Sequence, residues 1–413
     1  MRKKILLTLL ILGILSASPS PAQVTKGQLV RDYITKVYQL ILNHTLYPVS
    51  YMDVIEGAWK EIKQGILIEL PQPQNWQDVL SNLAELEEIF PEENSRFGEL
   101  AIRGMLGALP DPYCGLMNQT QRTNWENEQN GGGFPGLGIE LAVKNGGVEV
   151  AGTVSQSPAD RAGIQSGDQM VAVNQKPVIG LPFPEVLQML EGPIDQTVAL
   201  KLKRGSDILQ TTLTRAEIKL LPPQPKLYRV NGQLYGFIKI NYFSPQTPGE
   251  VEKALKILNG KGIQGLILDI RNNPGGNFNA GLVTASFFVS GKPVALVEEK
   301  GGRKIPFFTD KSPLYRGKIV VIINRATASA AELLALALQS NNLAILVGEQ
   351  SYGKNLIQTA YSLTNNYALY LTTNRFWGVT SQDIGGVGLK PDLPADTNGD
   401  EKVLLKIAIK ALN

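Results

Sequence analysis

The chain has 413 residues, 43% of them hydrophobic and 19% charged, an ordinary composition for a globular protein of about two or three domains. The three basic residues at positions 2–4 account for the whole formal charge of +3, so the rest of the chain is neutral and has no global field to attract nucleic acid. One histidine, His44, and one cysteine, Cys114, disfavour a transition-metal site, and a lone cysteine forms no disulfide within the chain.

Residues 1–22 have the layout of a secretory signal peptide. Basic residues at 2–4 precede an apolar run at 5–15, and small and turn residues follow through Ala22. A retained membrane anchor is the alternative, but a spanning helix needs about 20 apolar residues. No cysteine lies near the cleavage region, which disfavours a lipoprotein. We therefore expect an exported protein that is cleaved after Ala22.

Residues 23–125 are predicted to form a helical N-terminal region. Apolar residues recur at helical spacing between Val30 and Ile62, and prolines at 48, 71, 73 and 91 separate the segments. The helices are expected to end near Leu109, with a loop rich in Pro, Asn, Gln and Gly over residues 110–133. His44 falls near a helix end, where a surface or capping role is favoured over catalysis.

Residues 130–216 show short strands and two short helices. The segment 136–143 is strand-like, a tight turn follows at 145–146, and residues 148–154 pair back. Ser157 is a helix N-cap, residues 182–190 form a second helix, and residues 197–213 form a hairpin.

This pattern, opened by the glycine-flanked loop Gly136, Leu137, Gly138 and Ile139, resembles a PDZ domain. The resemblance implies that the loop binds a peptide's terminal carboxylate and that the peptide adds as an extra strand. Residues 131–136 also match the dinucleotide fingerprint GxGxxG. That interpretation is rejected, because a strand follows the motif and Pro135 lies inside it.

Residues 217–413 are predicted to form an α/β core. Buried strands at 265–270, 319–324 and 343–348 alternate with helical segments near 280–289 and 330–339, which indicates parallel crossover units. The tail at 396–400 is interpreted as a turn before the last helix rather than a calcium loop. The expected fold class is thus multidomain α+β.

Three polar segments follow these strands, at residues 271–276, 325–331 and 349–355, and the carboxyl ends of parallel strands share one sheet edge. A helix of about twelve residues after Ser329 runs back ~18 Å, and a six-residue strand returns about 20 Å. Lys354 is therefore expected at the level of Ser329.

The segment GEQSYGKN at 348–355 nearly matches the phosphate-loop pattern GxxxxGK[ST]. Asn355 stands in place of the hydroxyl residue, and the sequence that follows alternates like strands rather than opening a helix. A nucleotide-binding enzyme is therefore the least favoured hypothesis.

The other interpretation pairs Lys354 with Ser329. A serine needs a neighbouring base, and a lysine serves if desolvation lowers its pKa by ~3 units. The N–H of Ala330 at a helix start and that of Gly275 are candidate oxyanion donors. The competing interpretation is that Ser329 and Glu332 form only a capping box.

Four segments follow one another along this part of the chain: DIRNNPGG at 269–276, VVIINRATASAAELLALALQ at 320–339, LVGEQSYGKNLIQ at 346–358 and GVGLKPD at 386–392. Together and in this order they resemble the signatures of the carboxyl-terminal processing proteases. A helical region, a PDZ domain and then a peptidase core is also that family's order. The resemblance implies a nucleophile at Ser329, a general base at Lys354, a lysine-orienting glutamine at Gln358, and oxyanion donors at Gly275 and Ala330. It implies no cofactor. Asp269 and Arg271 match too and are interpreted as a structural pair.

The family resemblance predicts an exported serine endopeptidase that cleaves proteins near their C-termini, with the PDZ domain capturing the tail and gating the site. Its partners would be proteins or peptides with accessible C-termini, membrane-associated ones included. The location would be the periplasm, or the thylakoid lumen if the source is photosynthetic. The alternative is a catalytically inactive PDZ-containing binding protein or chaperone.

The sequence also departs from the family pattern. Thr327 and Ala331 replace flanking serines, Ser340 stands where an acid is common, and Asn355 replaces a glycine after the lysine. None removes the nucleophile or the base. We expect these departures to affect the rate and the flexibility of the loop around Lys354.

Overall fold

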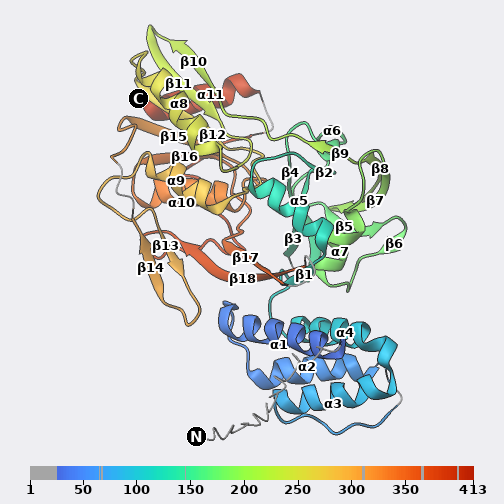
Figure 1. Ribbon diagram of the computed structural model, residues 1–413. Coiled ribbons are helices and arrows are strands. Elements are labelled where there is room, and N and C mark those ends of the chain that lie inside the picture. Colours follow the sequence, from blue (N-terminus) through green and yellow to red (C-terminus); the bar gives the residue numbers. More distant parts are fainter. Residues whose placement is uncertain are drawn as a thin grey trace, which may run out of the picture.

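The computed structural model describes residues 26–413 except 65, 67, 145, 309–311, 364–366 and 398–399. The predicted signal peptide, residues 1–22, lies outside the described residues. Within the described ranges, no helix has the length and apolar character needed to cross a membrane. A helical region lies at one end of the molecule, and a small antiparallel domain lies beside a larger α/β core (Figure 1). The predicted multidomain α+β class is confirmed.

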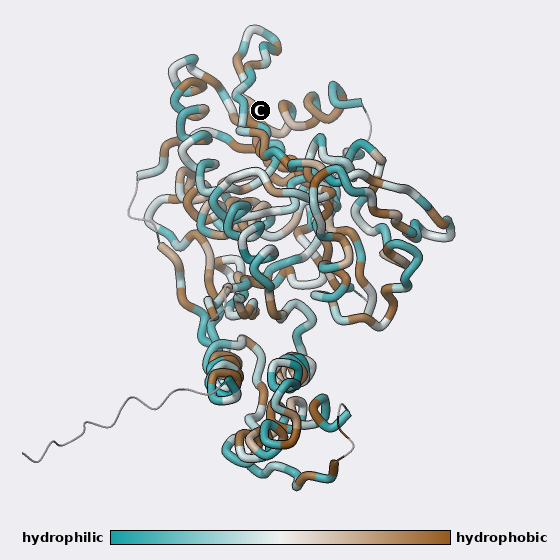
Figure 2. Tube along the Cα trace, turned by 45° about the vertical axis from the view of Figure 1, so that its right-hand side comes forward, coloured by the Kyte–Doolittle hydropathy of each residue, from teal (hydrophilic) through white to brown (hydrophobic). Residues whose placement is uncertain are grey.

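Four helices form the N-terminal region: α1 (Lys26–His44), α2 (Tyr51–Gln64), α3 (Trp76–Ile89) and α4 (Asn94–Gly107), with a short 3₁₀ turn η1 (Pro91–Glu93). Hydrophobic and hydrophilic positions alternate around these helices (Figure 2), so each buries one stripe against the others. Gly57 and Gly104 let α2 and α4 approach closely, because a Cβ at Gly104 would lie 2.0 Å from the carbonyl oxygen of Gly57.

The loop predicted over residues 110–133 is wrong, since the structure has β1 (Gly115–Met117) and α5 (Gln119–Gln129) there. Helix α5 buries none of its residues fully and so lacks the apolar stripe on which the prediction depended. It begins instead with a capping box, in which Asn118 Oδ1 accepts from Gln121 N at 2.9 Å and Gln121 Oε1 accepts from Asn118 N at 2.9 Å.

The antiparallel domain is a sheet in the order β3-β4-β5-β7-β8 with two short helices. Its elements are β2 (Phe134–Gly136), β3 (Ile139–Lys144), β4 (Gly147–Thr153), α6 (Pro158–Arg161), β5 (Gln169–Val173), β6 (Lys176–Pro177), α7 (Phe183–Leu190), β7 (Thr197–Arg204), β8 (Asp207–Thr214) and β9 (Ala216–Ile218). Ser157 caps α6 as predicted, accepting from Asp160 N at 3.2 Å. Strand β3 lies at the sheet edge, where a peptide strand can add.

The core sheet has the order β10-β11-β12-β15-β16-β19, parallel from β11 to β19. These strands are β10 (Gln224–Val230), β11 (Gln233–Lys239), β12 (Gly265–Asp269), β15 (Lys318–Ile323), β16 (Ala344–Gly348) and β19 (Leu393–Pro394). Helices α8 (Thr247–Asn259), α9 (Phe278–Ser286) and α10 (Ala330–Ser340) cover one face, and α11 (Glu401–Leu412) covers the other. The predicted crossover units are therefore confirmed.

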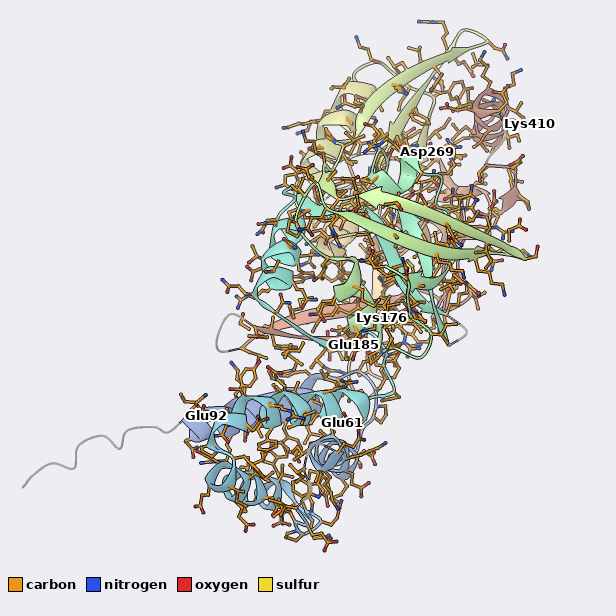
Figure 3. The ribbon with its side chains drawn as sticks, turned by 90° about the vertical axis from the view of Figure 1, so that its right-hand side faces the viewer. Glu61, Glu92, Lys176, Glu185, Asp269 and Lys410 are labelled. Atoms are coloured by element: carbon orange, nitrogen blue, oxygen red, sulfur yellow. The ribbon has the colours of Figure 1, made fainter. Side chains whose placement is uncertain are left out.

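A second sheet joins the parts of the molecule. It contains β1, β18 (Ala368–Trp377), β13 (Ala295–Glu298) and β14 (Lys304–Phe307), and β17 (Leu356–Ser362) pairs with β18. Arg103 of α4 lies 3.7 Å from Glu61 of α2, within the helical region, and 3.3 Å from Glu185 of α7 in the small domain. The arginine therefore bridges these two parts. Figure 3 labels these two acids on the two sides of the junction. The helical region is thus attached to both of the other parts.

Candidate active site

Ser329 occupies a strained turn between β15 and α10. Its φ is +53°, a conformation that residues other than glycine rarely adopt. Helix α10 is buried along its length, so the turn cannot relax outward. Ser329 lines a cavity of about 340 Å³. Ala330 is the first residue of α10, where a backbone N–H has no acceptor within the helix.

Gly275 packs directly against the turn that carries Ser329. A Cβ on Gly275 would lie 2.7 Å from Ser329 Cβ and 3.0 Å from Ala330 N, so only glycine permits this approach. The backbone N–H of Gly275 donates to Asn273 Oδ1 at 2.9 Å, and Asn273 O accepts from Ala328 N at 3.0 Å. The structure thus brings Gly275, Ser329 and Ala330 together. Oxyanion binding by Gly275 and Ala330 stays a prediction.

Lys354 lines the same cavity, as the strand and helix lengths predicted. Its ammonium group donates to Glu140 Oε1 of strand β3 at 2.7 Å, and 13% of the lysine side chain is exposed. Burial lowers the pKa of Lys354, but the negative charge and hydrogen bond of Glu140 outweigh burial and raise that pKa above its ordinary value. The downward shift expected from desolvation is therefore wrong for this arrangement, in which Lys354 is protonated.

Gln358 lies on β17 and also lines the cavity. Its amide nitrogen donates to Thr372 Oγ1 of β18 at 3.3 Å, and among the described residues it makes no hydrogen bond to Lys354. The structure therefore places Gln358 at the site without showing it orienting the lysine, and that role stays a prediction.

The predicted peptide-binding loop opens into the same cavity as Ser329. Gly136, Leu137, Gly138 and Ile139 line one part of it, and α7 contributes four apolar side chains, Phe183, Pro184, Leu187 and Leu190. The groove between β3 and α7 is thus continuous with the nucleophile. A chain held in the groove would reach Ser329 without leaving the cavity.

Helix α5 supplies a wall of the cavity that the sequence analysis missed. Glu128 accepts a short hydrogen bond from the hydroxyl of Tyr242, and burial raises the pKa of Glu128 to about 7. Gln129 at the same end of α5 accepts from Asn277 at 3.0 Å. Only a capping signal at Asn118 marked this helix in the sequence. Within the described ranges, no group of three or more His, Cys, Asp and Glu side chains is placed to hold a metal ion.

Comparisons with known proteins identify the fold and the chemistry. The family model "Peptidase family S41" matches residues 234–395, and a PDZ domain model matches residues 149–204. The chain is 31% identical to the carboxyl-terminal-processing protease of Picosynechococcus sp., over 82% of each chain. This chain belongs to peptidase family S41. It is a serine peptidase with a PDZ domain, of the carboxyl-terminal processing group.

Two further relatives of this S41 peptidase support the assignment. It is 31% identical to the chloroplastic carboxyl-terminal-processing peptidase 1 of Arabidopsis thaliana, over 84% of this chain and 73% of that protein. The solved structure of a photosystem II D1 C-terminal processing protease matches with a TM-score of 0.73 and 25% identity, covering 93% of this chain and 98% of that one. The likeness therefore extends across all three parts of the fold.

Asn355 has a structural explanation in this S41 peptidase. It is 2% exposed, and its amide nitrogen donates to Phe376 O at 3.1 Å and to Asp383 Oδ1 at 2.8 Å. The backbone carbonyl oxygen of Asn355 accepts from Phe376 N at 3.0 Å. A glycine could make the backbone bond but not the two side-chain bonds, so Asn355 stiffens the lysine loop through its attachment to Phe376 of β18 and to Asp383.

The other departures also have identifiable contacts. Thr327 is fully buried and donates to Ile270 O at 2.9 Å, which ties the serine turn to the end of β12. Ser340 Oγ accepts from Val379 N at 3.4 Å at the far end of α10. Ala331 packs in the core of the α/β domain. None of these residues contacts the ammonium group of Lys354.

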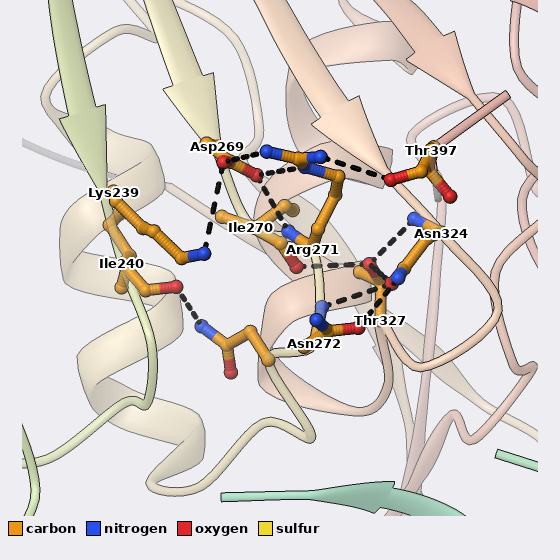
Figure 4. Close-up of polar contacts among 10 residues, drawn as sticks. Lys239, Ile240, Asp269, Ile270, Arg271, Asn272, Asn324, Thr327 and Thr397 are labelled. Atoms are coloured by element: carbon orange, nitrogen blue, oxygen red, sulfur yellow. Dashed lines mark hydrogen bonds and ion pairs between the residues drawn. The ribbon is translucent and has the colours of Figure 1, made fainter. Parts of the chain in front are cut away.

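Asp269 and Arg271 form the structural pair that the sequence suggested (Figure 4). Arg271 Nε and Nη2 donate to the two oxygens of Asp269 at 2.9 and 2.7 Å, and Arg271 Nη1 donates to Thr397 O at 3.2 Å. Asp269 is fully buried and 13% of the arginine side chain is exposed. The pair anchors the start of the loop that ends in Gly275.

We predict that Asp269→Ala destabilises the core by about 3–5 kcal/mol, because it leaves Arg271 buried without its partner. Urea unfolding followed by circular dichroism measures the change. Lys256→Ala is the control, since it removes an exposed pair with Glu252 (2.7 Å) and should cost at most about 1 kcal/mol. Equal effects of the two substitutions would contradict a structural role for Asp269.

Proposed function

We propose that this peptidase hydrolyses peptide bonds near the C-termini of protein substrates with a Ser329–Lys354 dyad. The observation that carries this proposal is that Ser329, Lys354 and the peptide-binding loop line one cavity. Ser329 Oγ attacks the scissile carbonyl carbon and passes its proton to Lys354 Nζ, which returns it to the leaving amine. Water then hydrolyses the acyl-enzyme. No cofactor takes part.

The remaining site residues assist this reaction. Gln358 orients Lys354, and the N–H of Ala330 stabilises the oxyanion as it develops, joined by the N–H of Gly275 once that group turns away from Asn273 Oδ1. Because Lys354 must be neutral to accept a proton, it has to leave Glu140 before catalysis. The PDZ domain, which holds Glu140, would therefore gate the site.

The substrates of this peptidase would be proteins or peptides with accessible C-termini, including membrane-associated ones. The loop at 136–139 would bind the terminal carboxylate, and the edge strand β3 would pair with the tail. The apolar side chains of Phe183, Leu187 and Leu190 favour an apolar residue in the tail. Residues 1–22 would export the enzyme to the periplasm, or to the thylakoid lumen in a photosynthetic source.

A serine-reactive fluorophosphonate distinguishes this enzyme from an inactive PDZ binding protein. We expect the purified protein, incubated with a peptide that has a free apolar C-terminus, to gain the mass of one probe less hydrogen fluoride, and mass spectrometry of its fragments to locate the phosphonyl group on Ser329. A protein that binds the peptide and yet gains no probe mass would contradict the proposal and support the binding protein.

A further inference from the structure

Glu332 is a buried carboxylate between the two catalytic segments. Its Oε2 accepts from Ser329 N at 3.0 Å and from Lys354 N at 2.8 Å. Its Oε1 accepts from Gly353 N at 2.7 Å and from Ser351 Oγ at 2.5 Å. The side chain is 0% exposed, so these four donors replace the water that a carboxylate would otherwise bind. One side chain thus links the nucleophile turn to the lysine loop.

A helix cap accounts for only one of these contacts. In a capping box the residue at the third helical position accepts from the N-cap backbone, which here is the bond from Ser329 N. The other three donors belong to residues 351–354, which follow β16 rather than α10. Ser351 Oγ in turn accepts from Leu389 N at 2.6 Å, so the connection extends into the segment GVGLKPD.

A second capping box in the same chain shows what capping alone requires. In α5 the third helical position is Gln121, a neutral and partly buried amide that accepts from Asn118 N at 2.9 Å. At Glu332, by contrast, burial raises the pKa to about 7, so keeping the carboxylate ionised is costly. An amide at position 332 would cap α10 equally well, but its NH₂ group would face two of the donors.

We propose that Glu332 is a positioning residue that sets Ser329 and Lys354 relative to each other, because its two carboxylate oxygens together accept from the backbone of Ser329 and from three donors of residues 351–354. This role rests on the function proposed above. Glu332 does not touch the substrate. It acts by holding the turn of Ser329 and the loop of Lys354 in register, so that the hydroxyl and the amine can meet once Lys354 is released from Glu140.

Glu332→Gln tests this role because the single amide oxygen can keep the bonds from Ser329 N and Lys354 N, whereas the NH₂ group faces Gly353 N and Ser351 Oγ and removes their acceptor, so the lysine loop loses half of its attachment. With an unstructured polypeptide as substrate, we expect kcat to fall roughly 100-fold, since small displacements of reacting groups cost about this much. KM should stay within about twofold, because the groove between β3 and α7 does not contact Glu332. An unchanged melting temperature would show that the fold and the cap are intact.

Glu349→Gln is the matched control, since Glu349 also accepts from a hydroxyl, that of Thr397, and pairs with Arg325 at 3.2 Å, without contacting Ser329 or Lys354. Its kcat should stay within about twofold of wild type. A Glu332→Gln enzyme with wild-type kcat would overturn the positioning role while leaving the proposed function intact.

If Glu332→Gln does not fold, the Ser351→Ala variant tests the same positioning role, because it removes one of the four hydrogen-bond donors to the Glu332 carboxylate. A kcat lowered several-fold with KM unchanged supports the role, and an unchanged kcat overturns it. A wild-type protein without peptidase activity would instead overturn the proposed function, and this role with it.

Discussion

Replacing Ser329 or Lys354 with alanine is expected to reduce cleavage on the order of 10⁴-fold or more, as removal of a nucleophile or its base does in other serine peptidases. Ser329→Ala removes the attacking oxygen but keeps the Cβ in the strained turn, so the fold should persist. Lys354→Ala removes the only proton acceptor that the proposed reaction uses. Release of a C-terminal fragment from an unstructured polypeptide, followed by mass spectrometry, measures both effects.

The cleavage rate of the double variant shows whether Ser329 and Lys354 act as a catalytic pair or as two independent residues. Groups that act as a unit are strongly non-additive, so Ser329→Ala with Lys354→Ala should be no slower than either single variant. Ser340→Ala, at the other end of α10, and Lys144→Ala, which pairs with Glu149 at 3.7 Å, are controls that should retain activity. Cleavage at the wild-type rate by either single variant would eliminate the dyad.

The placement of Ser329 and Lys354 in one cavity could be predicted because it depends on local regularities. Strands β15 and β16 are short and apolar, α10 connects them, and the parallel crossover fixes both of their carboxyl ends at one sheet edge. Periodicity also indicated that the N-terminal region is helical, and strand and turn signals located the two hairpins of the PDZ domain. In each case the pattern lay within a few consecutive residues.

Glu140 could not be assigned a role from the sequence, because its contact joins residues 214 positions apart in different domains. The alternating residues around Glu140 predict that it lies on a strand. The packing of the PDZ domain against the core cannot be predicted from neighbouring residues in the sequence. Helix α5 was missed for a related reason, since its helical state depends on polar contacts such as that of Gln121 with Glu191 at 3.1 Å. Glu332 was visible as a cap, but its three other donors come from a distant loop.

Glu140→Gln is expected to increase cleavage of a peptide with an amidated C-terminus, which lacks the carboxylate that the PDZ loop would bind. The substitution removes the charge that raises the pKa of Lys354, and burial then lowers that pKa. Well below the pKa, each unit of decrease gives about ten times more neutral amine. We therefore expect at least a roughly tenfold rise in kcat/KM at neutral pH, measured by continuous fluorescence of a quenched peptide.

The dependence of the cleavage rate on pH provides a second test of the Glu140→Gln prediction. Lys354 accepts a proton only in its neutral form, so the rate should rise with pH toward the pKa of the lysine. In the Glu140→Gln enzyme this rise should shift to lower pH, because the neutral amine is no longer disfavoured by the ion pair. Asp207→Asn removes an acid at the β7–β8 turn of the same domain and should leave the profile unchanged. If Glu140→Gln instead lowered the rate at every pH, the carboxylate would be assisting Lys354 rather than restraining it, and the PDZ domain would be an activator in its unoccupied state.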